Sequence, residues 1–400
     1  MSRKDRQPFD RTLKSLSATG FFISAQQQMI NPVIGIYANE SLRVSPALVG
    51  YIFTLFSLSS LLTKLSSFMI TTRRRVANPL FVSGLLISVF APLGYVLVED
   101  YVALLILRIV HGAAFAYDTV LMLTVAGHTQ DKNELLNAIQ RYTTFLAVGL
   151  TAGPVIGTAS VSLFGVRQTL LASSAMGVGA FITGFRSVRL VFDKSDTPTS
   201  TSSKQSTLKP LRDRVLIYTS LAYLSYNIAY GGVLAFSPLI ARKEIGLTEN
   251  LITVLFFLYY FSALLSRAML SRLISRIKVQ TVYQLILLIS AVGALLIAVF
   301  RSPAVFASGY VLMAVAHGLS FPLSTLIIAR HYENDAARLT ANSILMSMWD
   351  AGMMVGPLVS SAFLAFIPLN FVLIPMVVFP VAGCLFMILV SGTLDKYSRK

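Results

Sequence analysis

The sequence predicts an all-α integral membrane protein, with twelve transmembrane helices arranged as two six-helix, pseudo-symmetric halves. Three observations predict this fold class. Hydrophobic residues make up 55% of the 400-residue chain and charged residues 12%, whereas a soluble chain carries roughly twice that share of charge. Apolar stretches long enough to cross a bilayer follow one another along the chain. Sequence motifs of the first half also return in the second half at a nearly constant distance.

The apolar stretches are each about 20 residues or longer, the length at which an α-helix spans a bilayer. They cover residues 15–37, 46–70, 77–98, 102–126, 138–164, 167–187, 213–240, 249–272, 279–300, 303–329, 339–366 and 369–393. Two of these stretches begin with helix-capping signals, Ser45 before Pro46 and Thr248 before Glu249. A mean hydropathy of +0.71 agrees with a multi-pass membrane protein.

Two motifs carry the repeat. Residues 149–154 read Gly-x-x-x-Gly-Pro, and residues 352–357 repeat the pattern at a distance of 352 − 149 = 203. The His-Gly pair at residues 111–112 returns at residues 317–318, a distance of 317 − 111 = 206. Repeats of such a long period indicate that one structural unit is used twice. In a membrane protein, two parallel halves are typical of a transporter with its site between them.

A polar segment separates the first six predicted helices from the last six. Residues 193–210 are rich in Ser, Thr, Lys and Pro and offer little apolar surface to bury, so they are predicted to form a flexible linker. The predicted organisation is an N-terminal half over residues 1–190, a cytoplasmic linker over 191–212 and a C-terminal half over 213–400. Because each half has an even number of helices, both halves take the same orientation in the membrane.

The formal net charge is +16, from 33 Lys and Arg against 17 Asp and Glu. Basic residues gather at both termini and in every second loop. The alternate loops hold only Arg43, Arg167, Arg242, Lys243 and Arg301. This positive-inside pattern predicts a multi-pass protein of the cell membrane with both termini in the cytoplasm. Membrane topology and attraction to anionic lipid explain the charge, so we expect the lipid bilayer and no nucleic acid as a partner.

No enzymatic signature is present in the sequence. The chain has no phosphate-binding Gly-Lys-Ser/Thr loop, no His-Glu-x-x-His and no Gly-x-Ser-x-Gly motif. Cys384 is the only cysteine and lies in an apolar stretch, so neither an intrachain disulfide nor a cysteine metal cluster is expected. We therefore predict a protein that is not an enzyme and holds no cofactor or metal.

Several motifs resemble those of the major facilitator superfamily of secondary transporters. Residues 108–114 resemble the family's Arg-x-x-Gln-Gly-x-Gly motif, with His111 in place of Gln. Residues 149–158 resemble Gly-x-x-x-Gly-Pro-x-x-Gly-Gly, with Thr158 in place of the last Gly. In the family this second motif is typical of exporters that exchange substrate for protons, so the motif content is closest to the proton-coupled drug and multidrug exporters. The family's basic loop after the second helix is matched only by Arg73 and the basic tail behind it.

Charged side chains inside a bilayer are costly and tend to face a cavity or a partner. At about 100° per residue, Asp118 returns to within about 20° of His111 along the helix predicted at 102–126, and Arg108 lies on the same side. A buried carboxylate that meets water alternately from two sides is a natural proton carrier. Proton coupling is therefore predicted for Asp118, Asp350, Arg108 and His111. The alternative for each is a hydrogen bond that only stabilises helix packing.

Polar and aromatic side chains also recur near the middle of other spans. The resemblance implies that the first, fourth, seventh and tenth helices line a central cavity. The predicted substrate contacts on these helices are Gln27, Asn31, Tyr223, Tyr226, Asn227, Tyr230 and His317. Aromatic faces with a few amides suit amphipathic or cationic organic molecules. For His317 the alternative is a packing hydrogen bond, and for the tyrosines it is a place in the interface belt.

A further set of residues is predicted to act in conformational change. These residues are Gly149, Gly153, Pro154, Gly157, Gly352, Gly356, Pro357 and Arg73. Glycines at i and i+4 allow close helix approach, and a following proline removes one backbone donor and bends the helix. We expect Gly153 and Gly356 to lie against helices of the opposite half, where the two halves seal and part. Plain close packing is the alternative.

The sequence thus predicts a monomeric secondary active transporter that moves a small organic solute by rocker-switch alternating access. The main hypothesis is proton-coupled export of amphipathic or cationic compounds, because of the motif at residues 149–158 and the intramembrane acids. The alternative is a uniporter or importer of a metabolite such as a sugar or organic anion, which Arg108 and the eroded basic loop favour. A remote alternative is a non-transporting membrane sensor.

Overall fold

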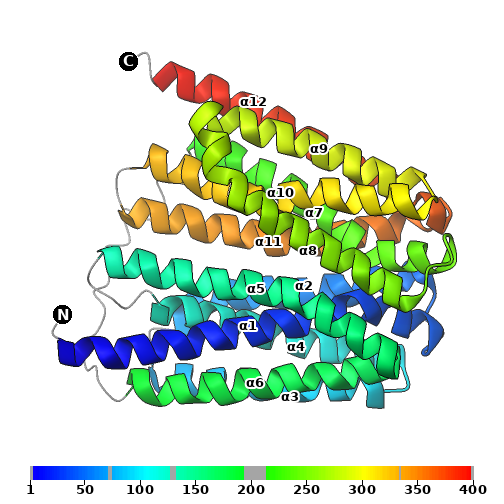
Figure 1. Cartoon of the computed structure of the whole chain (residues 1–400), viewed down its shortest axis with the longest axis horizontal. Helices are drawn as coiled ribbons and strands as arrows, with labels where there is room; N and C mark the ends of the chain where they lie inside the picture. Colours follow the sequence, from blue (N-terminus) through cyan, green and yellow to red (C-terminus); the bar gives the residue numbers. More distant parts are fainter. Residues whose placement is uncertain (1–2, 71–73, 127–131, 193–212, 333–334, 398–400) are drawn as a thin grey trace. The chain divides into compact units, whose positions relative to one another are not determined.

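The computed structural model describes residues 3–70, 74–126, 132–192, 213–332 and 335–397, and all regular structure in these ranges is helical (Figure 1). The α-helices are α1 Arg3–Glu40, α2 Pro46–Ile70, α3 Arg74–Leu97, α4 Tyr101–Ala126, α5 Lys132–Phe164, α6 Val166–Phe192, α7 Arg214–Lys243, α8 Glu249–Arg276, α9 Val279–Val299, α10 Pro303–His331, α11 Asp335–Phe363 and α12 Val378–Tyr397. Twelve helices match the twelve predicted spans, and the all-α fold class is confirmed.

Eight helical segments in the described ranges are long and apolar enough to cross a membrane. They belong to α2, α3, α5, α7, α8, α9, α10 and the segment that ends in α12. Large apolar side chains such as Leu65, Phe90 and Leu285 stay exposed on these helices, as expected where a helix faces lipid. The α7 helix differs, because 94% of its apolar window is buried inside the protein. It is therefore an inner helix whose side chains contact other helices.

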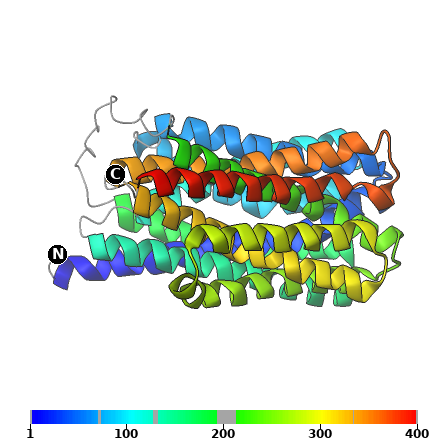
Figure 2. The same cartoon turned by 90° about the horizontal axis from the view of Figure 1, so that it is seen from above.

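The repeat seen in the sequence is also present in the helix packing. The first helix of each half packs against the last two, so α1 contacts α5 and α6 while α7 contacts α11 and α12. The third helix of each half packs against the fourth and the sixth, so α3 contacts α4 and α6 while α9 contacts α10 and α12. Figures 1 and 2 show α9 and α12 running side by side. Both halves thus share one packing pattern.

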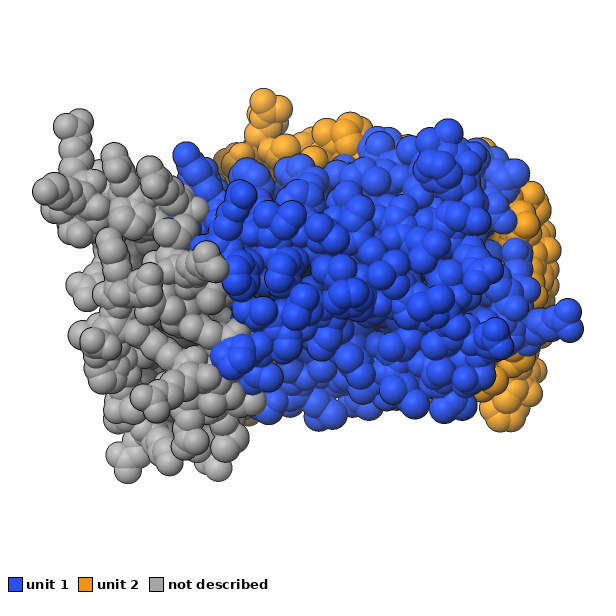
Figure 3. Space-filling view, turned by 90° about the horizontal axis from the view of Figure 1, so that it is seen from below, with its two compact units in different colours: residues 1–44, 55–198, 248–257 blue, residues 45–54, 199–247, 258–400 orange. Residues whose placement is uncertain are grey.

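The helices form two compact units, coloured separately in Figure 3. Unit 1 contains residues 1–44, 55–198 and 248–257, and unit 2 contains residues 45–54, 199–247 and 258–400. The first part of α2 therefore belongs to unit 2, and the first part of α8 belongs to unit 1. Within unit 2, the Thr54 hydroxyl donates to the Met354 carbonyl oxygen at 3.1 Å, and Gly50 lies against the Pro357 carbonyl oxygen.

The glycines of α5 and α11 pack against helices of their own half, so the expectation of neighbours from the opposite half is wrong. A side chain at Gly153 would meet the Ala25 carbonyl oxygen of α1, and one at Gly356 would meet the Ile228 carbonyl oxygen of α7. The sequence shows that one face of each helix carries glycines, but it does not show which neighbouring helix that face contacts. The α5 and α11 faces turn inward, toward the first helix of each half.

The last span begins differently from the prediction of a helix over residues 369–393. Two short 3-10 helices, η2 Leu369–Phe371 and η3 Ile374–Val377, precede α12. Pro375 stands in the first turn of η3, and its missing N–H and fixed φ explain why a regular α-helix does not run through this segment. The Arg301 guanidinium donates to the Asn370 carbonyl oxygen and ties the segment to the end of α9.

Candidate functional site

A buried polar cluster lies between α1, α3 and α4 in unit 1. The Gln27 amide nitrogen stands 3.2 Å from His111 Nε2, and the Tyr95 hydroxyl stands 2.6 Å from His111 Nδ1. An amide N–H can only donate, so in this arrangement Nε2 accepts from Gln27 and Nδ1–H donates to the Tyr95 oxygen. His111 is therefore neutral here. Protonating Nε2 would require the Gln27 amide to present its oxygen instead.

Arg108 completes this cluster from one helical turn away. Its side chain is 1% exposed, and its NH1 group donates to the Tyr95 hydroxyl at 3.5 Å. The guanidinium carbon lies 4.2 Å from the centre of the Phe56 ring, which is a cation–π distance. Phe56 also contacts the rings of His111 and Phe115, each at 5.6 Å between ring centres. Arg108, His111 and Phe115 thus form one stripe of α4 that faces α2.

The three consecutive amides of α1 face three different neighbours, as the helical period requires. The Gln26 amide donates to the carbonyl oxygens of Ser88 and Ser173 at 2.6 and 3.0 Å, which links α1 to α3 and α6. Gln27 contacts His111 of α4. Gln28 lies beside Gly153 of α5 and accepts from the Asn31 amide at 3.5 Å. Of the two α1 amides predicted to bind substrate, Gln27 and Asn31, only Gln27 joins the polar cluster.

The matching region of unit 2 is aromatic. Five aromatic rings surround the His317 ring at 4.8–6.3 Å between ring centres, namely those of Tyr226, Tyr230, Tyr259, Tyr260 and Trp349. We call these six residues the His317 aromatic cluster. They come from α7, α8, α10 and α11. The tyrosine stripe predicted on α7 thus faces α8 and α10 instead of the interface belt.

All four phenol groups of the His317 aromatic cluster are paired with one another. The Tyr226 and Tyr259 hydroxyls are 2.7 Å apart, and the Tyr230 and Tyr260 hydroxyls also share a hydrogen bond. His317 Nδ1 stands 3.2 Å from the Tyr226 hydroxyl. The four tyrosines are buried, while His317 and Trp349 remain partly exposed. Only His317 and Trp349 therefore present part of their side chains outside the cluster.

A glycine follows each of the two histidines and brings a neighbouring helix close to it. A side chain at Gly112 would meet the Phe56 carbonyl oxygen of α2, and one at Gly318 would meet the Ala263 carbonyl oxygen of α8. The absence of a side chain lets these backbones touch. Phe56 can then reach His111, and the tyrosines of α8 can reach His317.

The two other residues predicted on α7 have different partners. Tyr223 packs against Phe321 of α10 at 5.9 Å between ring centres. The Asn227 amide donates to the Tyr223 carbonyl oxygen of its own helix at 2.7 Å, and a side chain at Gly352 of α11 would meet its Cβ. The structure thus gives Asn227 a packing partner on α11.

Three predicted positions remain. Asp350 of α11 is 4% exposed and lies close enough to Tyr223 for an electrostatic interaction. The side chain of Asp118 lies outside the described side chains, and Arg73 lies outside the described residues. In the described part of the chain, no group of histidine, cysteine or acidic residues is arranged to hold a metal.

Two residues of each cluster are related by the repeat distance of 203. Gln27 corresponds to Tyr230, since 230 − 27 = 203, and each contacts the histidine of its own half. Phe56 corresponds to Tyr259, since 259 − 56 = 203, and each again packs on that histidine. The histidines themselves are 206 residues apart, three more than this distance, so two of the three positions are related by the same repeat distance. The cluster is polar and basic in one half and aromatic in the other.

The sequence profile described as the Major Facilitator Superfamily matches residues 16–278 and again residues 219–399. The chain belongs to the Major Facilitator Superfamily. It is therefore a multi-pass membrane transporter protein, as the predicted resemblance implied. No curated protein matches the sequence significantly.

Solved structures of transporters share the fold. A bacterial homologue of the human lysosomal transporter Spinster, in an inward-facing and unoccupied conformation, superposes with a TM-score of 0.76 at 15% identity, over 99% of this chain and 99% of that chain. The nucleoside transporter NupG, as a mutant, superposes with a TM-score of 0.73 at 13% identity, over 95% of this chain and 99% of that chain. At these identities the likeness establishes the fold alone.

In this member of the superfamily, the sequence reading missed the partners of the two histidines. Tyr95, Phe56, Tyr259, Tyr260 and Trp349 were not predicted. The repeat offset of 203 contained a signal for two of them, because it relates Phe56 to Tyr259. Trp349, the only tryptophan of the chain, stands directly before the predicted Asp350.

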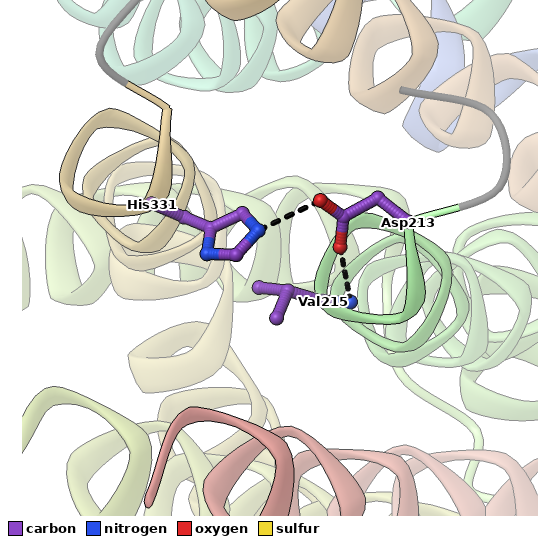
Figure 4. A network of polar contacts seen from close by, with 3 residues as sticks. All are labelled: Asp213, Val215 and His331. Atoms are coloured by element: carbon purple, nitrogen blue, oxygen red, sulfur yellow. Dashed lines mark hydrogen bonds and ion pairs between the residues drawn. The ribbon is translucent and has the colours of Figure 1, made fainter. Parts of the chain in front are cut away.

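A third polar network lies at the ends of α7 and α10 (Figure 4). Asp213 caps α7 by accepting from the Val215 N–H at 2.8 Å and pairs with His331 Nε2 at 2.7 Å. Burial raises the pKa of Asp213, but hydrogen bonds from His331, Val215 and Tyr332 outweigh it, so the pKa lies below its ordinary value. The sequence signal was only an acid at the first residue of the seventh apolar stretch, and its partner was not predicted.

Proposed function

We propose that this superfamily member is a secondary transporter that carries a small organic metabolite through the membrane by rocker-switch alternating access. The observation that carries the proposal is that each half of the chain buries a cluster around a histidine, one polar and basic and the other aromatic. Polar groups and aromatic rings are the two kinds of side chain that line sites for small organic molecules.

A metabolite carrier that works as a uniporter or an importer is our first candidate. Arg108 is a cation buried in the polar cluster, and a buried cation suits a polar or anionic solute group. One structural neighbour is named as a nucleoside transporter, which supports a metabolite as the class of solute. The loop after the second helix matches the family's basic motif only at Arg73 and the basic tail behind it. This difference separates the chain from the exporters whose motif at residues 149–158 it partly shares.

Proton-coupled export of amphipathic or cationic compounds is the second candidate. The motif at residues 149–158 favours it, and so do the aromatic rings around His317. In that case Asp118 and Asp350 carry the proton, with Arg108 and His111 adjusting its release. We further propose that the protein acts as a monomer in the cell membrane with both termini in the cytoplasm.

Transport by purified protein in proteoliposomes tests these candidates. The panel contains a nucleoside, a hexose, a dicarboxylate and a lipophilic cation, each assayed for counterflow and for uptake with and without an imposed pH gradient. Counterflow of a metabolite that ignores the gradient supports uniport. Accumulation of a cation that requires an opposing proton gradient supports export. If no solute moves faster than in liposomes without protein, the transport proposal fails.

Membrane orientation is tested separately. In a Cys384→Ser background, Ser200→Cys places one thiol in the predicted linker. An impermeant maleimide should label it only in inverted vesicles or broken cells, because the linker is predicted to be cytoplasmic. Labelling from outside intact cells would overturn the orientation.

A further inference from the structure

Arg267 is an exposed, positively charged residue inside a helix that is long and apolar enough to cross the membrane. It stands 276 − 267 = 9 residues before the end of α8 at Arg276, which is about 14 Å along the helix axis. A charged side chain at such a position is costly, and it normally contacts a partner, water or a solute. The side of α8 that carries Arg267 therefore determines what its guanidinium can meet.

Arg267 lies on the side of α8 that faces α10. At about 100° per residue, it is about 40° away from Ala263, whose carbonyl oxygen lies against Gly318 of α10. The exposed apolar residues Leu265 and Met269 form another side of the helix, about 160° away from Arg267. Arg267 thus points away from the side of α8 that suits contact with lipid.

The guanidinium of Arg267 is held at one edge and free at the other. Its Nε donates to the Gly318 carbonyl oxygen at 3.3 Å. Within the described residues, its two terminal nitrogens have neither a hydrogen-bond partner nor an ion pair. The N–H groups of a guanidinium form a planar fork that matches the two oxygens of a carboxylate. Because one edge is fixed to α10, the free edge is already oriented for an anionic group.

The charges around Arg267 select a solute with a single negative charge. Arg267 lies close enough to Tyr223 and His317 for electrostatic interactions. Asp350 interacts with the same Tyr223, so a second anionic group on the solute would approach a carboxyl group of like charge. One cation beside one acid thus favours a monoanion over a dianion.

Three partly exposed rings near Arg267 offer contact to an apolar solute body. They belong to His317, Phe321 and Trp349. The Trp349 ring is 5.5 Å from the His317 ring, and Phe321 packs against Tyr223 at 5.9 Å between ring centres. Unlike the buried tyrosines, these three side chains keep part of their surface outside the packed core. Apolar and aromatic surface beside one charged group is typical of a site for an amphipathic molecule.

We propose that Arg267 binds the single carboxylate of an amphipathic organic anion, whose apolar part lies against the exposed parts of His317, Phe321 and Trp349. This inference rests on the proposed transport function and names the solute class of that site. The headgroup of an anionic lipid offers similar oxygen atoms to a guanidinium, so the experiment has to separate a soluble anion from a lipid.

Trp349 is the only tryptophan of the 400 residues, so its fluorescence reports on this site. Purified full-length protein in nanodiscs of zwitterionic lipid is titrated at neutral pH with hexanoate, hexanamide, adipate and hexylammonium. These probes share one chain length and differ in charge. We expect saturable binding of hexanoate, and binding of the other probes that is weaker by about tenfold or more. Hexanamide or hexylammonium binding as tightly as hexanoate would overturn the requirement for an anion, and equally tight adipate binding would overturn the preference for a single charge.

A pair of variants assigns the binding to Arg267. Arg267→Gln removes the cation and should weaken hexanoate binding by about tenfold or more, the effect of losing a charge-assisted hydrogen bond. Arg272→Gln is the matched control, because Arg272 is an exposed arginine of the same helix about 140° away around its axis. It should leave hexanoate binding unchanged. Equal weakening by both variants would overturn the assignment, and if Arg267→Gln does not fold, the comparison of probes on the wild-type protein still decides.

A second set of nanodiscs distinguishes the two sources of an anion. In nanodiscs that contain phosphatidylglycerol, the hexanoate affinity of the wild-type protein should stay within about threefold, the dilution of an anion by the negative surface potential. Complete loss of hexanoate binding there would show that a lipid headgroup occupies Arg267, and it would overturn the assignment to a soluble solute.

The remaining outcomes separate this inference from the transport proposal. Hexanoate binding without counterflow of any monocarboxylate in proteoliposomes upholds the anion site and overturns its role in transport. If none of the probes changes the fluorescence, the anion site is wrong, even when the proteoliposomes transport a nucleoside or a hexose.

Discussion

Replacing single glycines of α5 by alanine should show which glycines of its motif the protein needs for stability and which it does not. In Gly153→Ala the new Cβ would stand 2.5 Å from the Ala25 carbonyl oxygen and 2.8 Å from Gln28 Cβ. In Gly157→Ala the nearest atom is Met29 Cα at 3.5 Å, an ordinary contact. Overpacking costs about 1–3 kcal/mol, and replacing Gly by Ala inside a helix gains about 0.5–1 kcal/mol. Both variants share the helix gain, so Gly153→Ala should be less stable than Gly157→Ala by about 1–3 kcal/mol.

The buried thiol of Cys384 makes this difference measurable. It is the only cysteine and is 7% exposed, so a fluorogenic maleimide reacts with it when the protein unfolds. A temperature ramp in detergent then compares the two variants at equal expression. Gly392→Ala is a second control, because no atom lies within 4 Å of its added Cβ. A melting temperature for Gly153→Ala at or above that of Gly157→Ala would refute the close α1–α5 packing.

Three further predictions concern charged groups. The depressed pKa of Asp213 means that its contribution to stability is complete above the unfolded pKa near 4 and is lost as pH falls through the folded value. The Asp213→Asn variant should therefore lose less stability than the wild-type protein when the pH falls from about 5 to about 2. Unfolding followed by tryptophan fluorescence measures this loss. An equal loss in both proteins would exclude the pairing of Asp213 with His331. Arg108→Gln should cost about 0.5–2 kcal/mol of stability by removing a cation–π contact and should slow transport; unchanged counterflow would exclude a transport role. Asp118→Asn and Asp350→Asn together should abolish pH-driven accumulation while counterflow persists, and accumulation that survives would exclude both acids as proton carriers.

The helix count and the repeat could be predicted because length and hydropathy determine which segments span a bilayer. The identity of each histidine's partners could not. His111 and His317 were found through their motif, but Tyr95 and Trp349 reach them only because α3 and α11 have particular rotations about their own axes. Such rotations depend on packing between helices that are distant in sequence. The same limit explains why Gly153 was expected to face the other half although it faces α1.

The boundary between the two compact units crosses the second helix of each half at the same repeat position. It follows residue 54 in α2 and residue 257 in α8, and 257 − 54 = 203, the distance that separates the glycine motifs. Each half of the chain thus contributes a ten-residue segment to the compact unit of the other half, residues 45–54 in one direction and 248–257 in the other. A half made as a separate polypeptide would lack one segment and would leave another without its packing partners. The two halves should therefore fold as mutually dependent fragments: cut within the linker, they should regain a stable protein when produced together and be degraded when produced apart.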